Sequence, residues 1–177
     1  VGFMIFCSYG NGYRLTGDSD YLEVIRNAAS SLSTRYSERV GAIRSWDWGD
    51  HWQYPVIIDN MMNLELMMWS SEKFELPGYA DLSVRHANNS MREHYRPDYS
   101  SYHVVSFDTI TGEAELKHTH QGYSHESAWA RGQAWGLYGF TVMYRFTKDP
   151  AYLELAQNIA DFIIHHPYTN QTGKKSQ

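Results

Sequence analysis

The feature that most constrains the fold is a nearly continuous apolar stretch at residues 54–69, with the sequence Tyr-Pro-Val-Ile-Ile-Asp-Asn-Met-Met-Asn-Leu-Glu-Leu-Met-Met-Trp. A surface helix keeps one polar face, whereas the Met, Leu and Trp side chains here would point in all directions. The sequence therefore predicts a helix that is surrounded by protein. Asp59, Asn60 and Asn63 fall on one side of its first turns. We expect that end of the helix to line a pocket.

An internal repeat organises the rest of the chain. Residues 13–23 and 144–154 match at seven of eleven positions, and a similar turn lies at residues 76–82. At each place one helix ends and another begins at Asp or Pro, which favour the first helical positions. The unit is a helical hairpin: a strongly buried helix (expected at 1–15, 57–72 and 127–147), a short turn, and a more polar, amphipathic helix.

Three such hairpins predict an all-α fold in which buried helices lie inside and amphipathic helices outside. They amount to about half of a six-hairpin (α/α) toroid. Alternation around Asp108–Gly112 predicts a small β-hairpin inserted at residues 101–119. We treat residues 1–177 as one partial barrel domain and expect 168–177 to be a disordered or unrelated tail. Half a ring would expose an apolar edge, so self-association through that edge is possible.

Composition limits the partners. A formal charge of −5 argues against nucleic-acid or anionic-membrane binding, but it leaves room for a small acidic ligand. The single Cys7 excludes an internal disulfide. Neither a membrane span nor a leader is visible, and the chain starts within an apolar segment, so we interpret it as a piece of a longer protein. A bacterial-type cytoplasmic or periplasmic location remains open.

The loop at residues 43–54 is rich in tryptophan and too polar for a plain connector. Trp46 and Trp48 lie within it, and all six tryptophans fall in the middle of the chain. Indole faces stack on sugar C–H groups, although a large aromatic core is the alternative. His118, His120 and His125 match no closed zinc pattern, so we expect hydrogen-bonding or solvated roles, with no metal and no cofactor.

The third buried helix carries a second set of polar and aromatic residues near its start. Gln121, Trp129, Arg131 and Trp135 lie there, followed by glycines at 132, 136 and 139 that indicate close helix packing. An arginine in an apolar helix needs a partner. Glu126 or Asp59 would be a structural partner, and a ligand carboxylate or sulfate a functional one.

These motifs resemble the unsaturated glucuronyl hydrolases, glycoside hydrolase family 88. The resemblance rests on Ile-Ile-Asp-Asn-Met-Met-Asn-Leu-Glu-Leu, on Ser-Ser-Tyr-His-Val-Val, on Thr-His-Gln-Gly-Tyr-Ser and on Ser-Ala-Trp-Ala-Arg-Gly-Gln-Ala-Trp-Gly. It covers the chain up to about residue 167. It implies an (α/α)6 barrel that releases a 4,5-unsaturated uronic acid from the non-reducing end of oligosaccharides produced by polysaccharide lyases.

The resemblance also implies roles for single residues. Asp59 would be the catalytic acid and base, protonating C4 of the enol ether and activating water for C5. The positions that match the substrate site are His103, Gln121, Trp129, Arg131, Trp135 and one tryptophan of the pair Trp46 and Trp48; Asn60 is a further candidate on the pocket side of its helix. The family's other essential Asp would precede Val1.

Alternative interpretations remain for the same residues. Asp59 fits a helix N-cap after Pro55, and a helix dipole would lower its pKa, whereas a proton donor needs a raised one. His103 could equally be a structural histidine that packs within the fold and does not contact a ligand. For the whole chain, an unsaturated rhamnogalacturonyl hydrolase and a non-catalytic sugar-binding or interface remnant are the alternatives.

Overall fold

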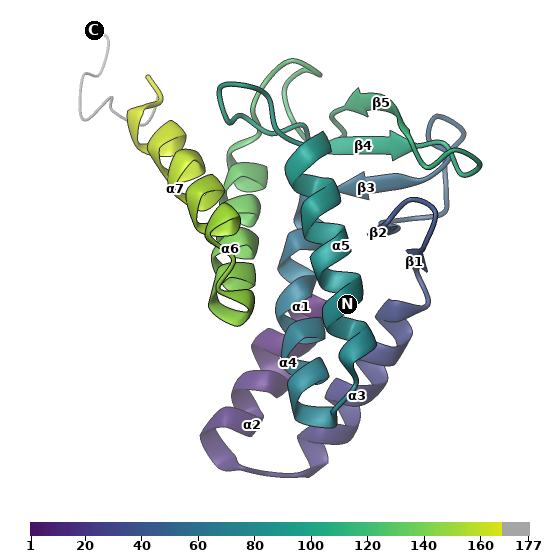
Figure 1. Cartoon of the computed structure of the whole chain (residues 1–177), viewed down its shortest axis with the longest axis vertical. Coiled ribbons are helices and arrows are strands. Elements are labelled where there is room, and N and C mark those ends of the chain that lie inside the picture. Colours follow the sequence, from purple (N-terminus) through teal and green to yellow (C-terminus); the bar gives the residue numbers. More distant parts are fainter. Residues whose placement is uncertain (168–177) are drawn as a thin grey trace, which may run out of the picture.

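The computed structural model of the chain describes residues 1–167, so the tail predicted at 168–177 lies outside the described residues. Three helical hairpins make up most of it (Figure 1). The helical elements are α1 (Gly2–Ile5), η1 (Phe6–Gly10), α2 (Asn11–Thr16) and α3 (Asp20–Ser33); η2 (Ile58–Asn63), α4 (Leu64–Phe74) and α5 (Pro77–Glu93); and α6 (Ala130–Thr147) and α7 (Pro150–His165).

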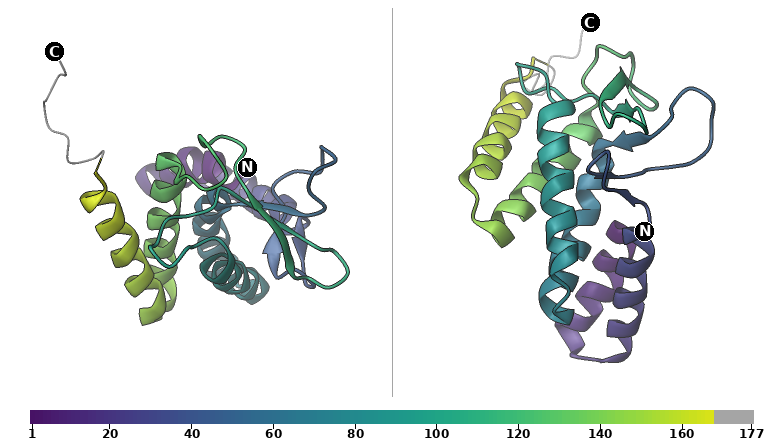
Figure 2. Two further views of the ribbon diagram at one scale, coloured as in Figure 1. Left: turned by 90° about the horizontal axis from the view of Figure 1, so that it is seen from above. Right: turned by 45° about the vertical axis from the view of Figure 1, so that its right-hand side comes forward.

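The hairpins stand side by side as part of a helical toroid (Figure 2). α4 contacts both α1 and α6, while α3, α5 and α7 pack against the helix of their own hairpin. The predicted fold class is therefore confirmed. The turns also follow the sequence signals: Gly17 ends α2 with φ at 72°, and Asp149 caps α7 by accepting a hydrogen bond from the Ala151 N–H at 3.0 Å.

The main buried core includes side chains from α3, η2, α4, α5, α6 and α7, and α6 crosses η2 closely within it. A Cβ atom added to Gly139 would lie 2.4 Å from Cβ of Met61, and one added to Gly132 would lie 3.0 Å from a methyl group of Ile58. Met61 and Ile58 are fully buried. The prediction that the glycines of this helix allow close packing is confirmed.

The predicted β-hairpin is present as β4 (Val104–Phe107) and β5 (Ala114–His118), which pair antiparallel. The sheet has a third strand that the sequence did not reveal, because β3 (Pro55–Ile57) pairs antiparallel with β4. The buried helix predicted from residue 54 is thus wrong in its first turn: it begins at Ile58 as the 3₁₀ helix η2. A short apolar run fits a buried strand as well as a helix. β1 (Tyr36–Ser37) and β2 (Ala42–Ile43) form a second small sheet.

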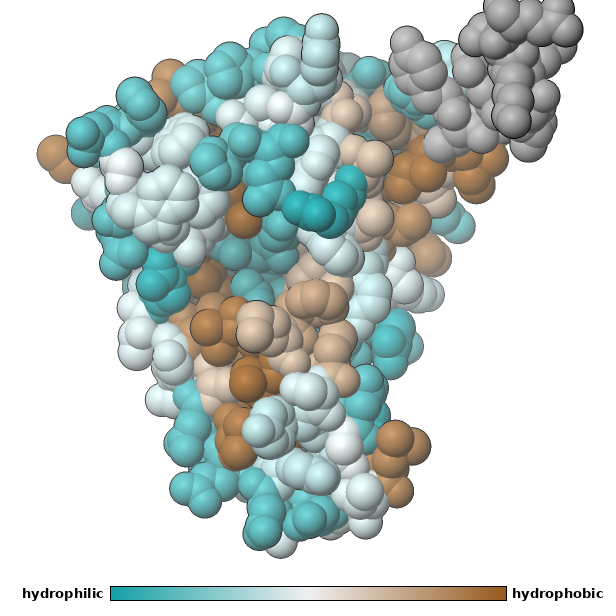
Figure 3. Space-filling view, turned by 180° about the vertical axis from the view of Figure 1, so that it is seen from behind, coloured by the Kyte–Doolittle hydropathy of each residue, from teal (hydrophilic) through white to brown (hydrophobic). Residues whose placement is uncertain are grey.

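The first helix of the repeat is less buried than predicted. Among residues 1–16 only Gly2, Phe6 and Gly10 are buried. Gly2 packs closely against Asn63, whose Oδ1 accepts a hydrogen bond from the Phe3 N–H at 3.1 Å. Val1, Phe3 and Met4 are exposed. Figure 3 shows apolar surface in the middle of the face on which α1 lies.

Within residues 1–167, no helix combines the length and apolar character that crossing a bilayer requires.

Candidate active site

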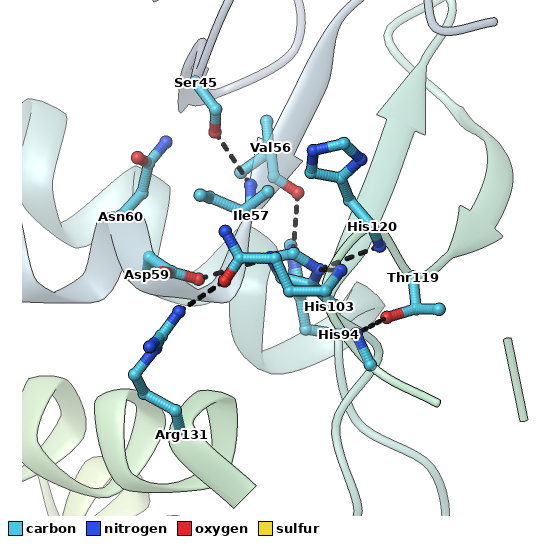
Figure 4. A network of polar contacts seen from close by, with 12 residues as sticks. Ser45, Val56, Ile57, Asp59, Asn60, His94, His103, Thr119, His120 and Arg131 are labelled. Carbon is cyan, nitrogen blue, oxygen red and sulfur yellow. Dashed lines mark hydrogen bonds and ion pairs between the residues drawn. The ribbon is translucent and has the colours of Figure 1, made fainter. Parts of the chain in front are cut away.

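Asp59 lies in the first turn of η2, directly after β3, at the end of the helix where the sequence predicts a pocket. The residue that caps η2 is Ile57, so the alternative interpretation of Asp59 as an N-cap is wrong. Its side chain is 27% exposed. Figure 4 shows Asp59, His103 and Arg131 turned toward one another from three different elements.

His103 precedes β4 and stands beside Asp59, because β3 and β4 pair and the backbone N–H of Ile58 donates to the His103 carbonyl at 3.0 Å. Its Nε2 lies 3.6 Å from Oδ2 of Asp59. Burial lowers the pKa of His103 to about 4, helped by the neighbouring His120, His94 and Arg131. The pair is therefore a neutral imidazole beside a carboxyl group and not a salt bridge at neutral pH.

Arg131 comes from the first turn of α6 and completes the cluster. Its guanidinium lies over the Trp129 ring at 4.5 Å and donates to Oε1 of Gln121 at 2.5 Å. The Trp129 ring in turn packs against His103 with ring centroids 4.5 Å apart. The fold thus brings the predicted residues Gln121, Trp129 and Arg131 together with His103. Neither predicted structural partner, Glu126 or Asp59, forms a direct ion pair with Arg131 among the described contacts.

The pKa of Asp59 is raised above its ordinary value, chiefly because burial disfavours the charged form. Its own backbone N–H, the Arg131 guanidinium and the Trp135 indole N–H act in the opposite direction but do not cancel the effect. The sequence left open what would offset the pull of the helix dipole on the pKa of a carboxyl group at a helix start. Desolvation by burial is the largest effect on Asp59, and it raises the pKa.

The tryptophans of the 43–54 loop form a second cluster beside this one. Trp46 stacks on Trp48 at 5.2 Å, and the Trp52 ring meets Trp46 edge-on at 5.5 Å. The His120 ring contacts all three at 5.7 to 6.0 Å. Trp48 is 56% exposed, so this aromatic cluster keeps a face open for a ligand.

Asn60 is placed differently from the other candidates. It is buried, its Nδ2 donates to the Ile43 carbonyl at 2.7 Å, and its Oδ1 accepts from Asn63 at 3.4 Å. The first contact fastens η2 to β2, the second lies within η2, and Asn63 in turn binds the Phe3 N–H of α1. These backbone contacts account for the polar side chains of both asparagines without a ligand. Direct contact of Asn60 with a sugar stays a prediction.

The sequence-based set did not include two residues that the structure adds to the site. His120 and Trp52 belong to the aromatic cluster. The available signal was their position in the sequence: Trp52 lies in the same loop as Trp48, and His120 directly precedes Gln121. Within residues 1–167 no group of three or more His, Cys, Asp or Glu side chains is arranged to hold a metal ion. His118 and His125 stack on each other at 4.2 Å, and Nδ1 of His125 accepts from the Thr119 N–H.

The fold and the cluster define a partial (α/α) barrel with a carboxyl–imidazole–guanidinium site at one end. No family model matches the chain. It is 45% identical over 175 residues, 98% of its length, to an unsaturated glucuronyl hydrolase of Formosa agariphila, of which it covers 44%.

Solved structures agree with this comparison. A crystal structure of an unsaturated glucuronyl hydrolase specific for heparin matches 94% of the chain with a TM-score of 0.91 and 55% identity, and the chain covers 44% of it. A mutant of the Streptococcus agalactiae enzyme complexed with dGlcA-GalNAc6S matches 92% with a TM-score of 0.72 and 33% identity, of which the chain covers 38%.

The resemblance seen in the sequence is therefore confirmed: nearly the whole chain is similar, in sequence and in fold, to one part of the unsaturated glucuronyl hydrolases, which are glycoside hydrolases of family 88. The chain spans less than half the length of these relatives.

Proposed function

We propose that this chain carries part of the active site, including the catalytic carboxyl group, of a hydrolase that releases a 4,5-unsaturated uronic acid from the non-reducing end of an oligosaccharide. The observation that supports it best is the Asp59 carboxyl group, partly buried with a raised pKa between His103 and the Arg131–Trp129 stack. A raised pKa favours the protonated form that a general acid needs.

In the proposed reaction, Asp59 donates its proton to C4 of the enol-ether double bond. The resulting carboxylate takes a proton from the water that adds to C5. The product is a hemiketal, which collapses with cleavage of the bond to the next sugar and opening of the ring. The partial exposure of the Asp59 side chain leaves room for both the sugar and this water.

The remaining residues have roles that follow from their chemistry. The Arg131 guanidinium is exposed, carries a positive charge and is oriented by Gln121 and Trp129, so it suits the uronate carboxylate. The indole rings of Trp129 and Trp135 line the pocket around the unsaturated sugar ring. Trp46 and Trp48 offer stacking faces for the next sugar.

Neither alternative is favoured. Curated relatives are named unsaturated glucuronyl hydrolase and unsaturated chondroitin disaccharide hydrolase, which gives no support to a rhamnogalacturonyl hydrolase. A non-catalytic remnant does not account for a partly buried carboxyl group that faces the imidazole of His103 beside the Arg131–Trp129 stack. Unsaturated oligosaccharide binding is also supported by the complexed relative.

Calorimetry with an unsaturated glucuronyl disaccharide and its saturated counterpart tests the proposal. We expect the unsaturated sugar to bind more tightly, and Arg131→Gln to weaken its binding at least about tenfold because a charge-assisted contact is lost. Arg92→Gln is the matched control, since Arg92 is exposed and its guanidinium bonds Glu93. Equal affinity for both sugars, or no effect of Arg131→Gln, would contradict the proposal.

Turnover is followed by loss of absorbance of the conjugated double bond. Because the chain spans less than half of its relatives, we expect it alone to be inactive or nearly so, and any residual rate to fall about a hundredfold or more in Asp59→Asn. Asp161→Asn is the control for the charge change, since Asp161 of α7 is exposed. Appreciable turnover that survives Asp59→Asn would exclude the catalytic role.

We also propose that two copies associate through the apolar face of α1 and α6. Val1, Phe3 and Met4 are exposed there together with Tyr138 of α6. Sedimentation of the chain is expected to show a concentration-dependent dimer that Met4→Glu weakens, while Ile110→Glu in the distant β4–β5 turn has no effect. A monomer at all concentrations would contradict this proposal.

A further inference from the structure

We propose that His103 is a positioning residue: two main-chain amides hold its imidazole as the neutral Nε2–H tautomer and aim that N–H at the Asp59 carboxyl group. The proposal deepens the proposed function, since it explains how the acid and base is oriented, but its geometric part holds whether or not the chain cleaves a sugar.

The tautomer follows from the contacts of Nδ1. This atom accepts a hydrogen bond from the His120 N–H at 3.0 Å and another from the Gln121 N–H at 3.1 Å. A backbone N–H can only donate, so Nδ1 must be unprotonated and the ring proton must reside on Nε2. Protonating Nδ1 would break both hydrogen bonds and set three N–H groups against one another.

The two amides are themselves held in place by the loop at residues 119–122. Oγ1 of Thr119 accepts from the Gly122 N–H at 2.7 Å, which closes a tight turn around His120 and Gln121. A Cβ atom on Gly122 would lie 2.5 Å from that hydroxyl oxygen, so the turn requires glycine. The Gln121 side chain also orients Arg131. One short turn thus fixes both the imidazole and the guanidinium of the site (Figure 4).

The other side of the ring faces the carboxyl group. Nε2 of His103 and Oδ2 of Asp59 are both buried, both lack a hydrogen-bond partner within residues 1–167, and lie 3.6 Å apart. The His103 side chain is 1% exposed and packs against Trp129, so the ring cannot turn away without disrupting that contact.

This arrangement decides what His103 can do in the reaction. With Nδ1 committed to two amides, the ring cannot accept a proton without losing both bonds, so it is not a second general base. Its N–H stabilises the carboxylate form of Asp59, which exists after the proton has been delivered to the sugar, and fixes which carboxyl oxygen faces the ring.

Nuclear magnetic resonance tests the proposal without a requirement for turnover. In the chain with ¹⁵N-labelled histidine, we expect His103 to show a protonated Nε2 and an unprotonated Nδ1 from pH 8 down to about pH 5. With ¹³C-labelled aspartate, His103→Asn keeps an acceptor for the amides but removes the N–H, and we expect the titration midpoint of Asp59 to rise by roughly half a pH unit. His103→Gln, whose amide can restore a donor near Nε2, is expected to bring it back toward the wild-type value.

Thr119 provides a second pair of variants that leaves the ring in place. Thr119→Val loses the hydroxyl that closes the turn and is expected to speed amide hydrogen exchange at residues 120 and 121, whereas Thr119→Ser keeps the hydroxyl and is expected to leave it unchanged. A protonated Nδ1 at pH 7, or an Asp59 midpoint that is the same in wild type and His103→Asn, would overturn the proposal. Failure of sugar binding alone would bear on the proposed function and not on this one.

Discussion

Replacing Gly139 by alanine is expected to destabilise the chain by about 2–3 kcal/mol, the cost of forcing extra volume into a close-packed core. The new Cβ would lie 2.4 Å from Cβ of Met61 and 3.0 Å from its carbonyl oxygen. The nearest atoms belong to the backbone and the first side-chain carbon of η2, so they cannot give way by a simple rotation. α6 and η2 would have to separate.

Separation of these two helices would reach the site, because η2 carries Asp59 and α6 carries Arg131 and Trp135. Urea denaturation followed by circular dichroism measures the loss as a lower midpoint. Gly78→Ala is the matched control: Gly78 lies in the first turn of α5 with nothing within 4 Å of its added Cβ. That change is expected to be neutral or to stabilise by up to about 1 kcal/mol. A Gly139→Ala variant with a wild-type midpoint would show that the packing is looser than described.

Local sequence patterns predicted part of this fold, and pairing between distant residues determined the rest. Repeated turns and the apolar stretch predicted the three hairpins, because helix ends and helix faces are encoded locally. The strand β3 was missed for the opposite reason. Residues 55–57 pair with residues 104–106, nearly fifty positions away, and no local pattern in an apolar tripeptide distinguishes a strand from a helix start. The β4–β5 hairpin was predicted because its turn lies between its strands.

The candidate site divides in a similar way. Gln121, Trp129 and Arg131 are near in sequence and were expected to meet, and the structure brings them together. The approach of His103 to Asp59 was implied by the family resemblance alone, since it depends on the pairing of β3 with β4. The tautomer of His103 was beyond the sequence, because it depends on the direction of two backbone amides. The same is true of Asn60, whose polar character suggested a pocket but whose amide serves the backbone of Ile43.

Mild acid is expected to destabilise the chain well above the pH at which ordinary carboxylates titrate, because buried histidines must stay neutral. Besides His103 of the site, these are His86 and His94. His86 joins α5 to β2 by accepting the Ile43 N–H at its Nδ1, and His94 joins the end of α5 to β3 by donating from Nε2 to the Val56 carbonyl. Burial lowers the pKa of His86 to about 3, with the neighbouring His94 adding to the effect. Burial likewise lowers the pKa of His94 to about 4.

The sign follows from proton linkage. Below about pH 6.5 both imidazoles are protonated in the unfolded chain but not in the folded chain. The unfolded state therefore binds more protons, and the free energy of unfolding decreases as the pH is lowered. The loss is about 1.4 kcal/mol per pH unit for each histidine, until the pH reaches the folded pKa values near 4 and 3. At pH 5 the two together would remove about 4 kcal/mol, a large part of the stability of an ordinary domain.

Variants that keep the hydrogen bonds but cannot titrate isolate this effect. His86→Asn places an amide oxygen near Nδ1 for the Ile43 N–H, and His94→Gln places an amide N–H near Nε2 for the Val56 carbonyl. Urea midpoints measured from pH 7.5 to 4.5 are expected to fall steeply in the wild-type chain. Each variant is expected to keep about two thirds of that slope, because His103, whose pKa is also lowered to about 4, still contributes. His51→Asn, at an exposed position in the 43–54 loop, leaves both buried imidazoles in place and should follow the wild-type curve. Equal slopes for all four proteins would mean that protons reach these imidazoles without unfolding, and that α5 is held to the two sheets by something other than neutral histidines.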